Sequence, residues 1–579
     1  MAGGFRIDLP RRGSEGPPAA IYENIQATAP VFTHPAMTVW SDEPFISLGD
    51  HGCIIGHLFA RGLPSRRIRH ADDAMIADIY RTGGQSLIAS HWGGYVLALV
   101  AGEGRTIIMR DPSGLLPCYF HRGLKVITLA SDITEVVSRG PGAIDYMELA
   151  RYLTSADGPG SATCVAGAEE LVPGEALVFQ GGRVDLESRW SPWNHVAPQD
   201  RTTAEAAEAF RAVAIDCIGA WAGCFGSALL GVSGGLDSSI VAAGARGRTA
   251  LSCVTHVGPD TEGDERHYAR ALANHLALDL QEARYELDDI DIAKPVAPHH
   301  PSPNAHHFRQ AIEAIHRRAA ARDDIGTILS GNGGDGIFCG MRSATPLVDR
   351  FVAEGPHRAL VATLRDLSDL TGADALTILR RAWRKYRECR EPQPLRMNVL
   401  GLAADRLPPI AAAGPRHKWH AAPSDALPGK RSHVAFLVRS LRSLELYPRR
   451  TSPPHVAPLM SQPLVELCLS IPTWQWIEGG RDRAVARMAF ENILPQTVLR
   501  RVHKGGPSGF TRKIYEYNRG EALDLLRGGR LVAAKILDPS FLDTPDDPDW
   551  RSSLRPDRLL GLVAAETWTR WWLGEDLTC

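Results

Sequence analysis

The chain has 579 residues, which is too long for one hydrophobic core, so two or three domains are expected. Hydrophobic residues make up 44% and charged residues 22% of the sequence, as in ordinary globular proteins. The formal net charge of −2 gives no overall attraction to nucleic acid or anionic lipid, so we expect neither a nucleic-acid nor a membrane partner. The sequence shows no signal-peptide pattern, no apolar segment long enough to span a bilayer and no Cys-x-x-Cys pair. These features favour a cytoplasmic protein.

The first part of the chain predicts a tail followed by a β-rich domain. Residues 1–43, which include a Pro- and Gly-rich stretch, are expected to form an N-terminal tail and lead-in. Between residues 44 and 195, short apolar runs alternate with turn signals, a pattern typical of strands. The clearest runs are 95–100, 106–109 and 176–179.

A polar segment at 194–201 forms the predicted junction with the second domain, residues 196–579. Thr202 and Glu205 have capping-box spacing at the start of an Ala-rich helix. Strand-like and helix-like segments then alternate, which predicts a parallel, doubly wound sheet, and from about 345 onward apolar residues recur at helical spacing. The expected strands begin near 228, 251 and 327, and the expected helices span about 264–275 and 308–321.

Two glycine-rich loops follow two of these strands. Because the carboxyl ends of parallel strands meet at one edge of a sheet, both loops are expected to face one ligand. Glycines allow close backbone approach, and a helix N-terminus favours an anion. No Walker A motif occurs in the chain. The loops are Gly231-Val232-Ser233-Gly234-Gly235-Leu236-Asp237-Ser238-Ser239 and Ser330-Gly331-Asn332-Gly333-Gly334-Asp335.

The first loop resembles the Ser-Gly-Gly-x-Asp-Ser loop of the ATP pyrophosphatases, which grips pyrophosphate when ATP is split between its α- and β-phosphates. The second is similar to the Ser-Gly-x-Gly-x-Asp element of the asparagine synthetases and β-lactam synthetases. The resemblance implies ATP and Mg²⁺ as cofactors, with Asp237 and Asp335 as catalytic metal ligands. The implied nucleotide-binding residues are Gly231, Ser233, Gly234, Gly235, Leu236, Asp237, Ser238, Ser239, Val257, Ser330 and Gly331.

A later segment also resembles this family. Leu494-Pro495 and Arg500–Gly506 are similar to its Leu-Pro…Arg-x-Lys-x-Gly segment, with one extra residue here. By this resemblance, Lys504 is a catalytic residue that balances charge during adenylation and acyl transfer, as a fixed ammonium can do. Arg481 and Arg483 align with an Arg-Asp-Lys/Arg element of the family.

The residue that accepts a proton from the amine is not determined. Between the glycines of the second loop, where asparagine synthetase has glutamate, stands Asn332, which can orient a nucleophile but cannot accept its proton. Near a second acidic position of the family the chain offers Ser461. Three candidate bases remain, namely Glu445, Glu466 and His503.

Phrases between residues 92 and 174 look like the amino-terminal glutaminase domain of the asparagine synthetases. That domain uses a cysteine directly after the initiator methionine, whereas this chain begins Met1-Ala2, and Cys53 and Cys118 are internal. We therefore expect a degenerate glutaminase-like domain that releases no ammonia. The phrases are Trp92–Tyr95, Arg110–Tyr119, Ala130–Asp132 and Leu171–Gly174.

The histidine pairs 299–300 and 306–307 admit two interpretations, a zinc site or a loop that lines the substrate channel. The predicted fold is an N-terminal glutaminase-like, Ntn-type β-rich α+β domain followed by an ATP-pyrophosphatase-type doubly wound parallel sheet with helical additions.

Family members that lack the glutaminase cysteine include β-lactam synthetases and lasso-peptide cyclases. The Gly-Gly-Asp of the second loop and the long helical carboxyl region look closer to the cyclases. The resemblance then implies that an Asp or Glu side chain of a precursor peptide is adenylated and attacked by the peptide's N-terminal amine. The implied partners are the precursor (core) peptide and a leader peptidase or leader-recognition protein. The alternatives are small-molecule lactam closure, an ammonia-dependent asparagine synthetase and a non-catalytic scaffold.

Overall fold

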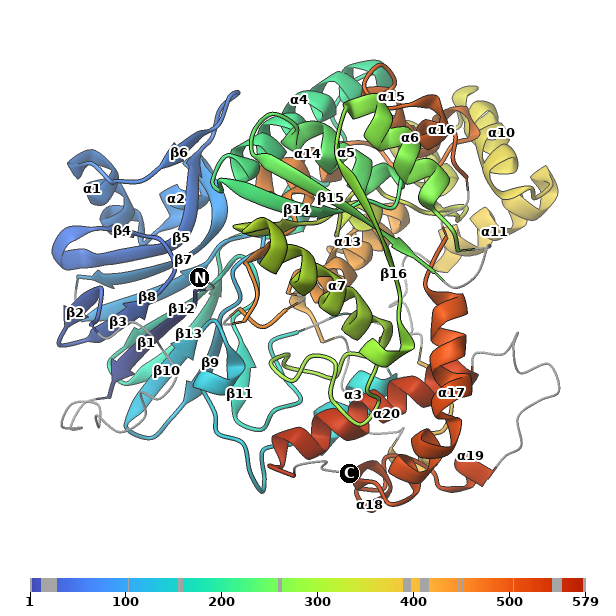
Figure 1. The fold of residues 1–579 in the computed structure, drawn as a ribbon. Coiled ribbons are helices and arrows are strands. Elements are labelled where there is room, and N and C mark those ends of the chain that lie inside the picture. The colour runs from blue at the N-terminus through green and yellow to red at the C-terminus, as the bar shows by residue number, and fades with distance from the viewer. Residues whose placement is uncertain are drawn as a thin grey trace.

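The computed structural model shows a β-rich N-terminal domain beside a parallel sheet covered by helices, with further helices toward the C-terminus (Figure 1). A β-rich domain followed by a parallel sheet with helices is the mixed α/β arrangement that the sequence predicts. The structure describes residues 3–11, 29–102, 104–154, 158, 160–258, 263–388, 397–406, 416–445, 447–449, 451–502, 505–543 and 555–575.

The N-terminal domain is a sandwich of two antiparallel sheets. Their strand orders are β11-β9-β10-β1-β3-β2 and β13-β12-β8-β7-β5-β4, with β6 paired to β5. Alternate residues of each strand point into one apolar core between the sheets, where Ile7 and Leu129 meet Ile55 and Ala98. The strands are β1 (Phe5–Pro10), β2 (Phe32–His34), β3 (Met37–Ser41), β4 (Phe45–Ser47), β5 (Gly52–Ala60), β6 (Arg66–Ile68), β7 (His91–Ala101), β8 (Arg105–Arg110), β9 (Tyr119–Arg122), β10 (Val126–Ala130), β11 (Ala168–Glu170), β12 (Glu175–Gln180) and β13 (Arg183–Ser188).

The predicted tail is wrong for its described residues. β1 lies between β10 and β3 inside the first sheet, and Phe5, Ile7 and Leu9 are at most 1% exposed. A six-residue strand is too short to show a clear period in the sequence, and its burial comes from pairing with β10, far along the chain. Residues 12–28, also part of that prediction, lie outside the described residues.

The second domain contains a five-stranded parallel sheet with the order β16-β15-β14-β17-β18. From β14 the chain moves to one side through β15 and β16, and then returns to the other side as β17. The switch point between β14 and β17 is where ligands bind in doubly wound sheets. The strands are β14 (Ser227–Gly231), β15 (Ala250–Val257), β16 (Leu280–Arg284), β17 (Thr327–Leu329) and β18 (His455–Val456).

Helices cover this sheet and extend the domain, as the sequence predicts. The Thr202–Glu205 capping box forms at the start of α4. The helices of the domain are α4 (Thr203–Ala222), α5 (Leu236–Ala245), α6 (Arg266–Leu276), α7 (Phe308–Asp323), α8 (Gly334–Ile337), α9 (Thr345–Glu354), α10 (Ala359–Thr371), α11 (Ala375–Glu388), α13 (Pro428–Ser440), α14 (Gln462–Ser470), α15 (Ala484–Ala489), α16 (Gln496–Leu499), α17 (Ser508–Arg527), α18 (Arg530–Ala533), α19 (Ser540–Asp543) and α20 (Arg555–Trp572). The N-terminal domain adds α1 (Asp73–Thr82), α2 (Gln85–Ser90) and α3 (Tyr146–Thr154).

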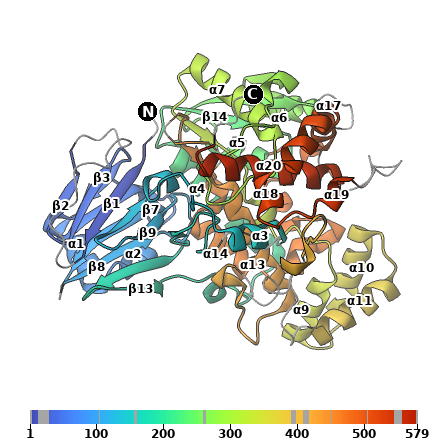
Figure 2. The same cartoon turned by 90° about the horizontal axis from the view of Figure 1, so that it is seen from below.

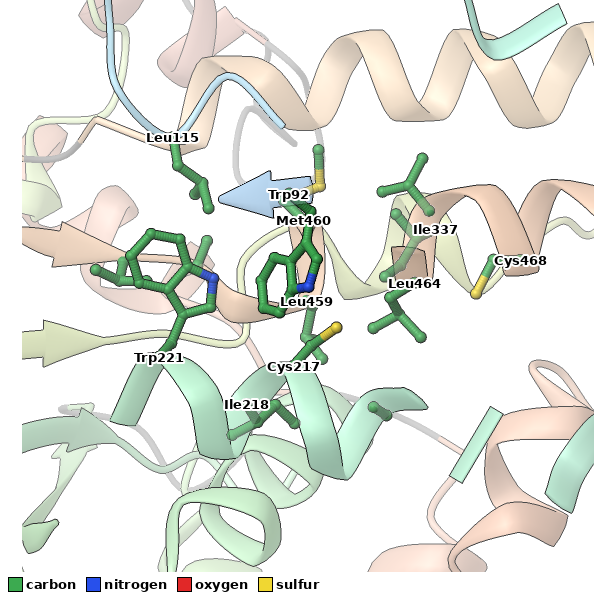
Figure 3. Packing of buried hydrophobic residues seen from close by; sticks show 14 of the residues in the cluster. Trp92, Leu115, Cys217, Ile218, Trp221, Ile337, Leu459, Met460, Leu464 and Cys468 are labelled. Atoms are coloured by element: carbon green, nitrogen blue, oxygen red, sulfur yellow. The ribbon is translucent and has the colours of Figure 1, made fainter. Parts of the chain in front are cut away.

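One continuous apolar core joins the two domains. Trp92 of β7 packs edge-on against Trp221 of α4, with ring centroids 6.5 Å apart, and Leu459 and Leu464 complete the contact (Figure 3). On another side, α17 and α20 share a core with α3 of the N-terminal domain (Figure 2 shows α20 beside α3). The boundary proposed between residues 195 and 196 therefore falls in the chain that connects the two domains. The two domains nevertheless share apolar cores.

Candidate active site

The two glycine loops meet at the switch point of the sheet. A Cβ on Gly331 would lie 2.7 Å from the backbone nitrogen of Ser238, and one on Gly334 would lie 2.5 Å from Cγ of Asp237. No larger residue fits either position without displacing the opposite loop. The glycines therefore bring the two loops into direct contact, at the shared edge that the sequence predicts.

The loop after β14 has the form of an anion site. Gly234 adopts φ +63°, and a Cβ there would lie 2.3 Å from Cβ of Tyr268 on α6. Ser233 Oγ accepts a hydrogen bond from Gly235 N (3.2 Å) and lies 3.4 Å from Ser238 Oγ. Hydroxyl groups and the N-terminus of α5, which begins at Leu236, thus share one small region, a combination that favours phosphate.

The two predicted metal-binding carboxylates converge on one cation. Arg483 Nη1 lies 3.2 Å from Asp237 Oδ1 and 2.8 Å from Asp335 Oδ1. The side chain of Asp237 is 8% exposed, whereas that of Asp335 is 67% exposed. Burial acts to lower the pKa of Arg483, but attraction by Asp237, Asp482 and Asp335 outweighs it and raises that pKa. The surrounding carboxylates therefore strongly stabilise a positive charge at the position of the Arg483 guanidinium group.

The same donor set suits a magnesium ion. Carboxylate oxygens are preferred ligands of Mg²⁺, at about 2.1 Å. Arg483 Nη1 lies within hydrogen-bonding distance of both Asp237 and Asp335, so its guanidinium group stands where a magnesium ion bound by these two carboxylates would lie. Arg481, the other basic residue of that element, is exposed.

The remaining predicted nucleotide-binding residues lie at the ends of adjacent strands. Gly231 ends β14, Val257 ends β15 and is 4% exposed, and Ser330 follows β17. Ser330 N donates to Val456 O of β18 at 3.0 Å. Lys504 lies outside the described residues, as does His503, so their predicted roles rest on the sequence.

The structure separates the other residues considered for proton transfer. The side-chain nitrogen of Asn332 donates to Ser443 O at 2.8 Å, which ties the second loop to a neighbouring segment. Glu466 accepts from Arg61 (2.8 Å) and from Trp190 Nε1 (2.9 Å), both in the N-terminal domain. Glu466 is therefore part of the domain contact and does not lie at the loops.

Ser461 is also a structural residue. It is fully buried, accepts from Trp221 Nε1 at 3.1 Å and donates to Pro458 O at 2.7 Å. Because both of these hydrogen bonds use the hydroxyl group, Ser461 stabilises the contact between the domains and does not act as a general base.

Arg501 is a site residue to which sequence reasoning gave no role. It donates to Ser233 O at 2.8 Å, pairs with Glu265 at 2.5 Å and lies over the ring of Tyr268 at 4.2 Å. It thus fixes the first loop against α6. The only sequence signal was its place beside Lys504 in the Arg500–Gly506 segment.

The internal cysteines of the N-terminal domain are core residues. Cys53 and Cys118 both pack in the core of the sandwich, and burial raises the pKa of each thiol to about 12. A thiol with such a pKa is not a nucleophile at neutral pH.

The paired histidines do not gather around a metal site. Within the described residues, no group of three or more His, Cys, Asp or Glu side chains is arranged to hold a metal ion. His300 and His306 instead line a cavity between the two domains. Burial lowers the pKa of His306 to about 4 and that of His300 well below its ordinary value, so both rings are uncharged at neutral pH.

Fold and site together define a two-domain enzyme, in which an Ntn-type sandwich is joined to an α/β nucleotide-binding domain. Residues 227–570 match the family described as asparagine synthase, and residues 64–191 match the one described as glutamine amidotransferase domain. The first match spans more than half of the chain, so the chain belongs to the asparagine synthase family.

Among solved structures, the chain is similar to a glutamine-dependent NAD⁺ synthetase from Acinetobacter baumannii in complex with ADP (17% identity, TM-score 0.18). That match covers 33% of this chain and 40% of the other, so the chain spans two fifths of that protein. It is also similar to a glutamine phosphoribosylpyrophosphate amidotransferase from B. subtilis with ADP and GMP (10% identity, TM-score 0.18, covering 56% and 84%). No curated protein matches the chain. None of the helices in the described ranges is long and apolar enough to span a bilayer.

Proposed function

We propose that the chain is a lasso-peptide cyclase, which closes a macrolactam ring in a ribosomally made peptide in the cytoplasm. An Asp or Glu side-chain carboxylate of the precursor peptide attacks the α-phosphorus of ATP, and pyrophosphate leaves. The peptide's N-terminal amine, freed by a leader peptidase, then attacks the acyl carbon, loses a proton and expels AMP. The product is lighter than the open peptide by one water.

The observation that carries the adenylation step is the convergence of Asp237 and Asp335 on one point beside the first loop. We propose that the hydroxyls of Ser233 and Ser238, which lie 3.4 Å apart near the N-terminus of α5, bind the departing pyrophosphate. A magnesium ion held by the two carboxylates would neutralise the phosphate charge. Lys504 is proposed to balance charge on the reacting oxygens.

The choice of an internal amine is supported by the N-terminal domain. Cys53 and Cys118 are core thiols with a pKa near 12. Because neither of these two thiols is a nucleophile, neither can hydrolyse glutamine by the usual route, which supports an amine that comes from the substrate itself. The domain then contributes packing, through the core around Trp92 and Trp221.

The test uses purified full-length protein with ATP, magnesium, a cognate precursor peptide and its leader peptidase. We expect pyrophosphate release and a product lighter by one water. Asp237→Asn should abolish both, whereas Asp288→Asn, at an exposed position outside the site, should retain them.

Other outcomes identify other functions. Amide formation from aspartate and ammonium would identify an ammonia-dependent asparagine synthetase. Pyrophosphate release with a small amino acid substrate and no peptide would identify small-molecule ring closure. ATP binding without turnover, unaffected by Asp237→Asn, would identify a scaffold and contradict the proposal.

A further inference from the structure

A cavity of about 210 Å³ lies between the two domains. Its walls come from the N-terminal domain, including Tyr152 of α3, and from the segments 300–309 and 441–445 of the second domain. This volume accommodates a side-chain-sized group and not a folded peptide. Its aromatic and charged lining includes Tyr119, Tyr152, Arg309, Arg442 and Glu445.

Two arginines of this lining lack anionic partners. Arg309 Nη1 and both Nε and Nη2 of Arg442 are buried and make no hydrogen bond. Across the described part of the chain, neither guanidinium forms an ion pair, although Arg442 lies over the ring of Tyr152 at 4.8 Å. Uncompensated burial lowers the pKa of Arg309. A buried guanidinium with unused donors is costly unless an anion completes it.

The other charged groups of the cavity do not neutralise these two. Arg110 pairs with Glu170 at 2.8 Å. Glu445 accepts from Tyr119 at 3.2 Å and lies 3.6 Å from Arg449 Nε. Burial raises the pKa of Glu445 to about 7, so it contributes only part of a negative charge near neutrality.

The cavity is connected to the second glycine loop. Asn332 Nδ2 donates to Ser443 O at 2.8 Å, and Ser443 stands directly beside Arg442 in the chain. The segment 441–445 therefore has one residue bonded to the active-site loop and others in the cavity wall. A group bound by Arg442 would therefore be held in a defined position with respect to the second glycine loop, where we propose that adenylation takes place.

We infer that this cavity binds a carboxylate group of the substrate, held by the guanidinium groups of Arg309 and Arg442. The planar guanidinium fork matches a carboxylate in geometry and charge. The inference rests on the proposed function in one respect, namely that the bound carboxylate belongs to the substrate that is adenylated. That carboxylate has two possible sources: an acidic side chain or small acid, or the carboxyl end of a peptide chain.

The test measures binding by calorimetry, with succinate as the first probe and acetyl-triglycine, carrying a free carboxyl end, as the second. Amidated acetyl-triglycine and inorganic phosphate are the comparisons. The full-length protein should bind at least one carboxylate and bind the amide much more weakly. Arg309→Gln and Arg442→Gln should each weaken binding about tenfold or more, the loss expected for a charge-assisted hydrogen bond. Arg317→Gln, at an exposed position on α7, should leave it unchanged.

The two probes distinguish the two sources of the carboxylate. Tighter binding of succinate assigns the cavity to a side chain or small acid, and tighter binding of acetyl-triglycine assigns it to a chain end. Equal binding of acid and amide, tighter binding of phosphate, or wild-type affinity in both arginine variants would overturn the inference. If Arg442→Gln fails to fold by circular dichroism, Arg309→Gln and the acid–amide comparison still decide. ATP affinity, measured on the same samples, reports separately on the glycine loops, so a failure of the proposed function is distinguishable.

Discussion

Replacing Gly334 by alanine should disable cation binding between Asp237 and Asp335 while leaving the fold intact. The new Cβ would lie 2.5 Å from Asp237 Cγ and 2.8 Å from its Oδ1. An ordinary contact is nearer 3.5 Å, so the Asp237 carboxylate must move by about 1 Å. Because magnesium–oxygen bonds are about 2.1 Å long with little tolerance, this shift removes one ligand. The overpacking should also destabilise the protein by about 1–3 kcal/mol.

The assay is calorimetric titration with ATP, in magnesium and in EDTA. Wild-type protein should bind ATP more tightly with magnesium, and Gly334→Ala should lose most of that difference. Gly226→Ala is the matched control, because nothing lies within 4 Å of a Cβ at that position just before β14. A folded Gly334→Ala protein with the wild-type dependence on magnesium would refute the reasoning.

Three further predictions concern other parts of the chain. Lys504→Met should lower the rate of pyrophosphate release about 100-fold, whereas Lys294→Met, at a surface ion pair, should not; equal rates would contradict the role of Lys504. The pKa of Glu445 is raised from 4.5 to about 7, so the folded state holds a proton that the unfolded chain releases, and stability should fall by about 3 kcal/mol as pH rises through this window. In urea denaturation, the free energy of unfolding of Glu445→Gln should not show this fall between pH 5 and pH 8. A variant that shows the same difference between the two pH values as the wild type would contradict the explanation. Gly520→Ala should raise the free energy of unfolding by about 0.5–1 kcal/mol, because Gly520 is an exposed interior residue of α17 with open space around it; a lower thermal midpoint would contradict this.

Local signals were sufficient for much of the second domain. The strand at 327–329, the helix at 308–321 and the Thr202–Glu205 capping box were predictable because each depends on residues close together in the chain. The meeting of the two glycine loops was also predictable, since parallel strands place their carboxyl ends at one edge.

Long-range pairing was not predictable in the same way. β1 was assigned to a tail because nothing in its six residues reveals that β10 and β3 lie on either side of it. The position of Arg483 between Asp237 and Asp335 depends on residues nearly 250 and 150 positions apart in the chain. The roles of Glu466 and Ser461 in the domain contact likewise come from partners in other elements.

The sequence by itself determined the chemistry of the two loops, because glycine, serine and aspartate at fixed spacing define what a strand–turn–helix corner can bind. Only the tertiary structure decided which cation lies between the carboxylates, which cysteines are buried, and that Arg309 and Arg442 line one cavity and form no ion pair with a described residue. The physical reason is that burial and charge pairing depend on neighbours in space, and a one-dimensional pattern records only neighbours along the chain.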